Sequence, residues 1–202
     1  MASIYQLKPA FQNLLRPIVA ALAQVGITAN QVTVSAFLLS ALGGAFIAFW
    51  PNQRWPLLTL PALLIIRMGL NAVDGLLARE HGQKSRLGAV LNELGDVASD
   101  AALYLPFALL PGIVGVLVYG VVLFSVMAEM SGIVAVQIGS SRRYDGPLGK
   151  SDRAFAFGTL GLCLGLGIPA GIWSNILLVV MVALSLFTVI NRAHKALAET
   201  PT

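Results

Sequence analysis

Charged residues are scarce in this sequence of 202 residues, where Asp, Glu, Lys and Arg together make up only 11%. A soluble domain carries about 25% of them. The sequence has a single cysteine, Cys163, so it is not a disulfide scaffold. Hydrophobic residues instead reach 57%, and the mean hydropathy is +0.81. These values exclude a soluble enzyme and a disordered tail protein, and they indicate an integral membrane protein.

Long apolar runs are what the sequence has in excess. A helix needs about 20 apolar residues to cross a bilayer core, so the length leaves room for roughly six such helices. Stretches bounded by Pro, Gly or charge predict an all-α bundle over residues 33–190. The predicted transmembrane helices are Thr33–Phe49, Pro56–Ala78, Leu87–Leu110, Ile113–Ile138, Ala154–Leu166 and Ile168–Ile190. No repeat or linker divides the chain, so we expect residues 1–202 to form a single membrane domain.

Residues 4–25 differ from these runs, because apolar side chains recur there every three or four positions between polar ones. Ile4, Leu7 and Phe11, for example, are interleaved with Lys8 and Gln12. This spacing predicts an amphipathic juxtamembrane helix that lies in the membrane interface and does not cross the bilayer. The polar interruptions also argue against a cleaved signal peptide.

Basic residues indicate how the predicted spans are oriented. They precede the first span, join the second to the third and the fourth to the fifth, and follow the sixth: Lys8, Arg16, Arg79, Lys84, Arg86, Arg142, Arg143, Lys150, Arg153, Arg192 and Lys195. The positive-inside rule makes that side cytoplasmic, so both termini are expected there. The opposite loops contain Arg54 with Trp50, Trp55 and Trp173, which is typical of an aromatic belt. The net charge of +4 favours anionic lipid or phosphate over nucleic acid as a partner.

Polar side chains gather at the cytoplasmic ends of the second and third predicted spans. Asn71 and Asp74 are three residues apart, so they share one helix face. Asn92, Asp96 and Asp100 follow at intervals of four and share a face of the next helix. The short connecting loop makes the two helices antiparallel neighbours, so both faces are expected to converge on one oxygen-rich pocket. Such a pocket suits Mg²⁺ and phosphate, whereas the alternative is a polar network that only pairs the helices.

The stretch from Asn71 to Asp96 resembles the signature of the CDP-alcohol phosphatidyltransferases. The D-G-x-x-A-R part of that signature is matched by Asp74, Gly75, Ala78 and Arg79, its later glycine by Gly88, and its last aspartate by Asp96. The likeness covers nearly the whole chain, including a T-x-N-x-x-T entry to the first span at Thr28, Asn30 and Thr33, and a glycine–lysine pair at Gly149 and Lys150. It is nearest to the bacterial inner-membrane branch, and it implies a multi-pass protein of that membrane and a homodimer.

The resemblance also implies an activity and a set of site residues. Family members transfer a substituted phosphate from a CDP-linked lipid, such as CDP-diacylglycerol, to an alcohol hydroxyl and release CMP, with Mg²⁺ or Mn²⁺ as cofactor. The implied metal ligands are Asn71, Asp74, Asn92 and Asp96, and the implied CDP-binding residues are Gly75, Ala78, Arg79 and Gly88. Close helix packing is the alternative explanation for Gly75, Ala78 and Gly88. Asp96 is the preferred catalytic base, and Asp100 is the reserve candidate.

Two positions depart from the family pattern, because its first and third aspartates are Asn71 and Asn92 here. An amide oxygen can ligate a cation but brings no charge, so the signature positions carry half of the family's negative charge. Asp100, one turn beyond Asp96, can restore part of it, and so can Glu93. The protein therefore uses one metal, recruits Asp100 or has weakened chemistry. The functional alternative is a catalytically silent protein that binds CDP-lipids.

A second basic cluster lies before the fifth span. Lys150 and Arg153 are three residues apart and share a helix face, and the resemblance places an acceptor pocket in this region. With Arg142 they are the implied binding residues for the acceptor or its phosphate, which favours an anionic acceptor. Arg142 and the neighbouring Arg143 can also simply mark the cytoplasmic side.

Two other intramembrane positions invited a functional interpretation. Glu129, within the fourth span, either lines the pocket or pairs with Arg67. Gly161 and Gly165 flank Cys163 in a G-x-x-x-G pattern, which favours helix packing over a nucleophilic role for the thiol.

Overall fold

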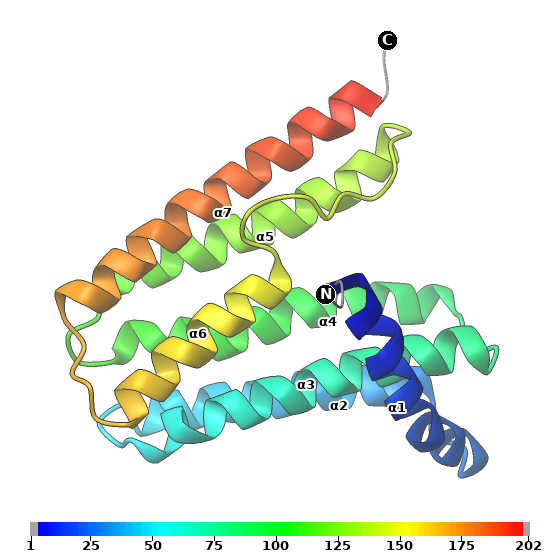
Figure 1. Ribbon diagram of the computed structural model, residues 1–202, viewed down its shortest axis with the longest axis horizontal. Helices are drawn as coiled ribbons and strands as arrows, with labels where there is room; N and C mark the ends of the chain where they lie inside the picture. Colours follow the sequence, from blue (N-terminus) through cyan, green and yellow to red (C-terminus); the bar gives the residue numbers. More distant parts are fainter. Residues whose placement is uncertain (1–3, 200–202) are drawn as a thin grey trace. The chain divides into compact units, whose positions relative to one another are not determined.

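The computed structural model describes residues 4–199, with side chains described from Phe11 onward, so the side chain of Lys8 lies outside the described part. Within that range the chain is helical and contains no strand (Figure 1). The all-α prediction is therefore confirmed. The elements are α1 (Ile4–Gln24), α2 (Ala29–Phe49), α3 (Trp55–Glu80), α4 (Arg86–Tyr104), the 3₁₀ helix η1 (Leu105–Leu109), α5 (Gly115–Gln137), α6 (Lys150–Gly165) and α7 (Ile172–Glu199).

Four helices in the described part are long and apolar enough to cross a membrane, namely α2, α3, α5 and α7. The other two predicted spans are helical but do not reach that standard. α4 places Arg86, Glu93, Asp96 and Asp100 within 19 residues, and α6 is only 16 residues long. The fold is thus an all-helical membrane fold with four candidate spans, and the count of six stays a prediction.

Proline and glycine account for two helix boundaries that differ from the predicted ones. The third predicted span, expected to continue to Leu110, is interrupted after Tyr104 by η1. Pro106 lacks an amide hydrogen and disfavours α-helical backbone at the residue before it, so a tight 3₁₀ segment replaces the α-helix. The sixth span begins at Ile172, four residues later than predicted. Gly167 adopts φ +97° and turns the chain after α6, and Pro169 then disfavours helical backbone at Ile168.

The chain divides into two compact units. The first combines the chain up to Leu42 with Ala62–Ser99, and the second combines Gly43–Pro61 with the chain from Asp100 onward. The core of the first unit joins α1 to the start of α2 and to the C-terminal part of α3. Its buried residues are Val19, Ala29, Val32, Val73, Leu76 and Leu77. Arg16 of α1 also forms a salt bridge of 3.1 Å with Glu80 at the end of α3.

The core of the second unit is built on aromatic stacking and close helix contacts. The rings of Tyr104 and Phe157 stack with their centroids 4.1 Å apart, and Phe107 packs edge-on against Phe157. A Cβ added to Gly161 would lie 2.8 Å from Cδ2 of Leu60. Gly165 is equally close to another side chain of α3, so the G-x-x-x-G pattern around Cys163 is a packing surface, as predicted.

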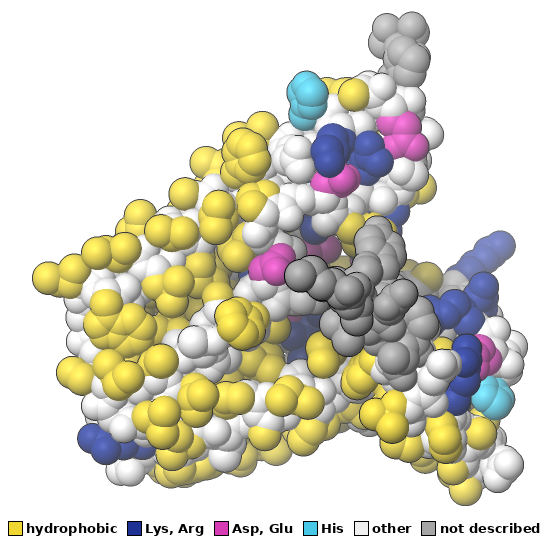
Figure 2. Space-filling view, in the orientation of Figure 1, with side chains coloured by type: hydrophobic (Ala, Val, Ile, Leu, Met, Phe, Trp, Pro, Cys, Tyr) yellow, Lys and Arg dark blue, Asp and Glu magenta, His cyan; other side chains and the backbone are white. Residues whose placement is uncertain are grey.

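Apolar side chains cover much of the outer surface of both units. Figure 2 shows yellow side chains along the helices and charged ones concentrated toward helix ends. Phe155 and Ile172 are 77% and 82% exposed, for example, where a soluble protein would bury them. This distribution suits helices that face lipid.

Candidate active site

Asp74 is the most deeply buried of the predicted metal ligands, with 4% of its surface exposed. The α3 helix carries it among the core residues Val73, Leu76 and Leu77. Its Oδ2 lies 2.7 Å from the hydroxyl of Thr33 on α2, which donates a hydrogen bond to it. The T-x-N-x-x-T entry to the first span therefore touches the signature aspartate directly. Nothing in the spacing of these two residues predicts that they pair.

The predicted convergence of the α3 and α4 faces is present in the first unit. Nδ2 of Asn71 donates a 3.0 Å hydrogen bond to Oδ1 of Asp96. The buried Arg67 donates to the carbonyl oxygen of Asp96 at 3.2 Å and lies 4.0 Å from its Oδ1. An aspartate at position 71 would face Asp96 with a second negative charge. Asn71 replaces that repulsion with a hydrogen bond.

The remaining predicted ligand, Asn92, is exposed on α4, one turn before Asp96. No cluster of three or more His, Cys, Asp or Glu side chains that could hold a metal ion occurs among residues with described side chains. The available donors are instead a mixed set, the carboxylates of Asp74 and Asp96 with the amide of Asn71. Hard oxygen donors of this kind fit Mg²⁺ or Mn²⁺.

The small residues of the signature make room for neighbouring side chains. A Cβ on Gly75 would lie 3.0 Å from Nη1 of Arg79, so the guanidinium of this exposed arginine folds back over the glycine. A Cβ on Gly88 would lie 2.7 Å from Oδ1 of Asn30 and 3.0 Å from Oγ of Ser85. Ala78 packs against the core of the first unit. Gly88 and Ala78 therefore lie in closely packed surroundings, and Gly75 accommodates Arg79.

Gln83, in the loop between α3 and α4, supports the same unit and was missed by the sequence analysis. Its Oε1 accepts a 2.7 Å hydrogen bond from the backbone N–H of Ala29, at the first turn of α2. Its Nε2 also donates to the carbonyl of Ile27 at 3.5 Å. The signature loop thus caps the helix that carries Thr33. Only the position of Gln83 inside the signature could have suggested a role for it.

The second unit contains a buried ionic quartet, formed by Asp100, Glu129, Arg153 and Arg192. Nη2 of Arg153 lies 3.0 Å from Oδ2 of Asp100 and 3.2 Å from Oε1 of Glu129. Nη1 of Arg192 lies 3.3 Å from Oε2 of Glu129. The quartet connects α4, α5, α6 and α7. Glu129, for which the sequence left open a pocket-lining role and a pairing with Arg67, pairs with these two arginines within this unit.

The other predicted basic residues of the second unit lie around the start of α6. Lys150 is half-buried at the first position of that helix. Asp152 accepts a 2.8 Å hydrogen bond from the N–H of Gly149 and so caps the helix start. The guanidinium of Arg142 lies over the ring of Tyr144, 5.1 Å from its centroid. Arg153 is 1% exposed and is held in the quartet.

The loop before α6 is also clamped to the end of α7. Nζ of Lys195 donates a 2.7 Å hydrogen bond to Oδ1 of Asp145. This bond, with the positive charges of Lys195 and Arg143, holds the pKa of Asp145 below its usual value. Glu199 adds a 3.0 Å salt bridge to Arg143.

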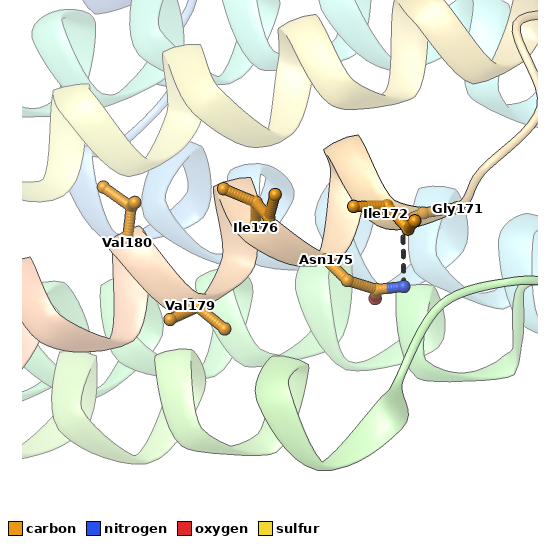
Figure 3. Close-up of a pocket in the computed structure, with 6 residues that line it drawn as sticks. All are labelled: Gly171, Ile172, Asn175, Ile176, Val179 and Val180. Carbon is orange, nitrogen blue, oxygen red and sulfur yellow. Dashed lines mark hydrogen bonds between the residues drawn. The ribbon is translucent and has the colours of Figure 1, made fainter.

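One open apolar groove lies along the start of α7 (Figure 3). Its lining residues are Gly171, Ile172, Asn175, Ile176, Val179 and Val180. Asn175 donates to the carbonyl of Gly171 at 2.9 Å, the bond drawn in the figure. No acid or base lines this groove, so it does not supply the chemistry of the polar residues above.

The match to a protein-family model covers most of the chain and both compact units. The model describes the CDP-alcohol phosphatidyltransferases and matches residues 26–190. This chain belongs to the CDP-alcohol phosphatidyltransferase family. Among curated relatives, it is 45% identical to the inner membrane protein YnbA of Escherichia coli over 195 residues, which cover 96% of each chain. It is 34% identical to archaetidylinositol phosphate synthase of Pyrococcus horikoshii over 106 residues, 52% of this chain and 53% of that protein.

Solved structures support the same fold for this phosphatidyltransferase homologue. The phosphatidylinositol phosphate synthase PgsA1 of Mycobacterium tuberculosis with CDP-DAG bound matches with a TM-score of 0.75 and 21% identity, covering 89% of this chain and 92% of that one. PgsA1 in complex with manganese and citrate matches with a TM-score of 0.74 and 21% identity, covering 89% and 87%. At this identity the likeness establishes the membrane fold.

Proposed function

We propose that this protein transfers a phosphatidyl or similar substituted phosphate group from a CDP-linked lipid, such as CDP-diacylglycerol, to an alcohol hydroxyl and releases CMP. The reaction takes place at the cytoplasmic face of an inner membrane. The observation that carries the proposal is the Asn71–Asp96 hydrogen bond, which joins the two signature helices in the unit that buries Asp74. Family membership, and the CDP-DAG bound to the related PgsA1, support the class of donor.

The first unit supplies the groups for the donor. Asp74 and Asp96, with amide oxygens from Asn71 and Asn92, would hold Mg²⁺ or Mn²⁺. When bound, the cation supplies positive charge that neutralises phosphate oxygens. Arg79 offers a planar guanidinium to the pyrophosphate, beside the small residues Gly75, Ala78 and Gly88.

The transfer itself needs one proton to be moved. As the acceptor oxygen forms its bond to the phosphorus, the bond from phosphorus to the CMP oxygen breaks, and the hydroxyl proton passes to a carboxylate. We assign this role to Asp96, because the amide of Asn92 cannot accept a proton at neutral pH. Asp100 is the reserve base, and its salt bridge to Arg153 makes it the weaker candidate.

Several parts of the proposal concern the whole protein. Lys150, Arg153 and Arg142 are assigned to the acceptor side, six helices to the membrane, and the functional form to a homodimer. The amphipathic α1 lies in the cytoplasmic interface, where its exposed Leu14 and Ile18 contact lipid. Both termini are cytoplasmic.

A second candidate function is a silent protein that binds CDP-lipids without transfer. The observation that favours it is the amide of Asn71, which occupies a family aspartate position. This amide donates a hydrogen bond to Asp96. Reduced negative charge at the metal site would weaken catalysis more than binding.

The deciding experiment measures CMP release from CDP-diacylglycerol by the purified protein with Mg²⁺ or Mn²⁺, across a panel of alcohols. Asp96→Asn is the test variant, and Thr59→Val, a change outside the signature helix faces, is the matched control. Release that requires metal and Asp96 would support the transferase. Metal-dependent binding of CDP-diacylglycerol without release would favour the silent protein, and absence of both would refute the nucleotide site.

A further inference from the structure

The buried ionic quartet carries equal numbers of positive and negative charges. Arg153 and Arg192 are 1% and 2% exposed, so their guanidinium charges are compensated by protein groups and hardly solvated by water. Glu129 reaches both of them, with one carboxylate oxygen toward each. A carboxylate between two guanidiniums occupies the position that a bound phosphate would take.

Arg192 also donates two hydrogen bonds to backbone carbonyls. Its Nη1 donates to the carbonyl of Ala128 at 2.6 Å, and its Nε donates to the carbonyl of Asp145 at 3.0 Å. This arginine therefore anchors α7 to α5 and to the loop before α6.

Arg153 has a buried donor without a hydrogen-bond partner among the described residues, its Nε. Its Nη2 serves Asp100 and Glu129, and its Nη1 lies 3.4 Å from the carbonyl of Leu148. Its Nε is buried and has no hydrogen-bond partner among the residues whose side chains are described. This buried N–H suits a hydroxyl oxygen of an acceptor.

Glu129 is the most accessible member of the quartet. Its side chain is 16% exposed, against 2% for each arginine and 8% for Asp100. A molecule that approaches the quartet therefore meets a carboxylate. A hydroxyl can donate a hydrogen bond to it, while an anion is repelled and could bind only by displacing Glu129 from both arginines.

We propose that Glu129 is a built-in counter-anion that closes the arginine pair to phosphate, so that this protein uses an uncharged alcohol as its acceptor. The specificity claim rests on the transferase function proposed above, but the exclusion of phosphate does not. It also replaces the expectation of an anionic acceptor, because that expectation treated Arg153 as a binding residue for phosphate.

The test compares phosphate binding by the wild-type protein, Glu129→Gln and Glu199→Gln, with inorganic phosphate as the probe and chloride at equal ionic strength as the reference. Glu129→Gln keeps the shape of the side chain and removes its charge. Glu199→Gln removes the same charge from the exposed end of α7. We expect stabilisation by phosphate, measured as a shift in melting temperature, only in Glu129→Gln, with an affinity at least about tenfold above that of the wild type.

Acceptor choice provides the second measurement. Wild-type CMP release should be faster with glycerol or inositol than with glycerol 3-phosphate, and Glu129→Gln should shift this preference toward the phosphorylated alcohol. Phosphate binding by the wild type equal to that of Glu129→Gln, or wild-type preference for glycerol 3-phosphate, would overturn the proposal. If Glu129→Gln does not fold, Glu129→Asp and the wild type decide it, because both must still exclude phosphate. Loss of CMP release with every acceptor refutes only the transferase function, since phosphate binding is measured without turnover.

Discussion

The hydroxyl of Thr33 lies 2.7 Å from Oδ2 of Asp74 and 3.1 Å from the carbonyl oxygen of Ala29. A hydroxyl has one hydrogen to donate, and the nearer, charged carboxylate is the stronger acceptor. Thr33 therefore fixes the position of Oδ2 of Asp74. The first span thus takes part in shaping the site through a residue outside the D-G-x-x-A-R segment.

Replacing Thr33 by Val removes this hydrogen bond while preserving the shape of the side chain. Hydrogen bonds to charged groups contribute about 1.5–3 kcal/mol, which corresponds to a loss of roughly 10- to 100-fold in metal-dependent CMP release. Titration of activity with Mn²⁺ measures the effect. The hydroxyl of Thr59 donates to the carbonyl of Pro56 within α3, so Thr59→Val should change activity little. Equal activities of the two variants would contradict the role of Thr33.

Asn71→Asp restores the family residue at the cost of the hydrogen bond to Asp96. With EDTA present we expect the melting temperature to fall, because two carboxylates then face each other at a cost of about 1–3 kcal/mol. With Mn²⁺ present we expect affinity to rise by roughly an order of magnitude, since ligand charge tunes metal affinity. The difference between the two melting temperatures reports both effects.

Asn92→Asp is the matched variant for that experiment. It adds the same charge at an exposed position of α4, so it should change stability in EDTA much less than Asn71→Asp. If both variants lose equal stability, the Asn71–Asp96 bond does not contribute as described.

Close contact between α2 and α4 depends on Gly44. An added Cβ would collide with the carbonyl oxygen of Ala102, which belongs to the backbone and cannot turn aside. We expect Gly44→Ala to destabilise the protein by about 1–3 kcal/mol, as overpacking does. Gly69→Ala, where nothing lies within 4 Å of the new methyl group, should be neutral or stabilising by up to about 1 kcal/mol. Thermal unfolding in detergent compares them, and similar losses would refute the contact.

Acid should weaken the clamp between Asp145 and Lys195. The pKa of Asp145 is lowered in the folded protein, chiefly by the hydrogen bond from Lys195. Its contribution to stability is therefore complete above the unfolded pKa of about 3.9 and is lost as the pH falls through the lower folded value. Lys195 is 46% exposed, so Asp145→Asn should cost no more than about 1 kcal/mol at pH 7.

The measurement is the difference in melting temperature between wild type and Asp145→Asn as a function of pH. It should be constant from neutral pH to about pH 5 and should shrink below about pH 4. A difference that stays constant into the acid range would show that the charge of Asp145 does not stabilise the fold.

Sequence reasoning predicted the convergence of Asn71 and Asp96 because local geometry was sufficient for it. Intervals of three and four placed the polar residues on single faces, and a short loop made α3 and α4 antiparallel neighbours. The family signature lies entirely within this local arrangement. The prediction did not depend on how helices distant in the sequence are rotated against each other.

Partners on distant helices could not be predicted in the same way. α5 is apolar on every side, so no periodicity indicates which direction Glu129 faces. The sequence therefore does not distinguish a pocket-lining role for Glu129 from a pairing with Arg67. Thr33 posed the same problem, since one threonine among apolar residues has no preferred partner 41 positions away. α4 ends earlier than predicted, because the proline in η1 stops the α-helix inside an apolar run.

The quartet also constrains how the chain enters the membrane. Asp100 and Arg153 lie on α4 and α6, two predicted spans that lack the length or apolar character of the four candidate spans. A single charge at the bilayer centre costs about 2.5–3.5 kcal/mol during insertion, and pairing removes much of that cost. Neither helix is expected to leave the translocon alone. The last helix of the chain carries Arg192, so charge balance in the lipid is complete only when synthesis has reached α7.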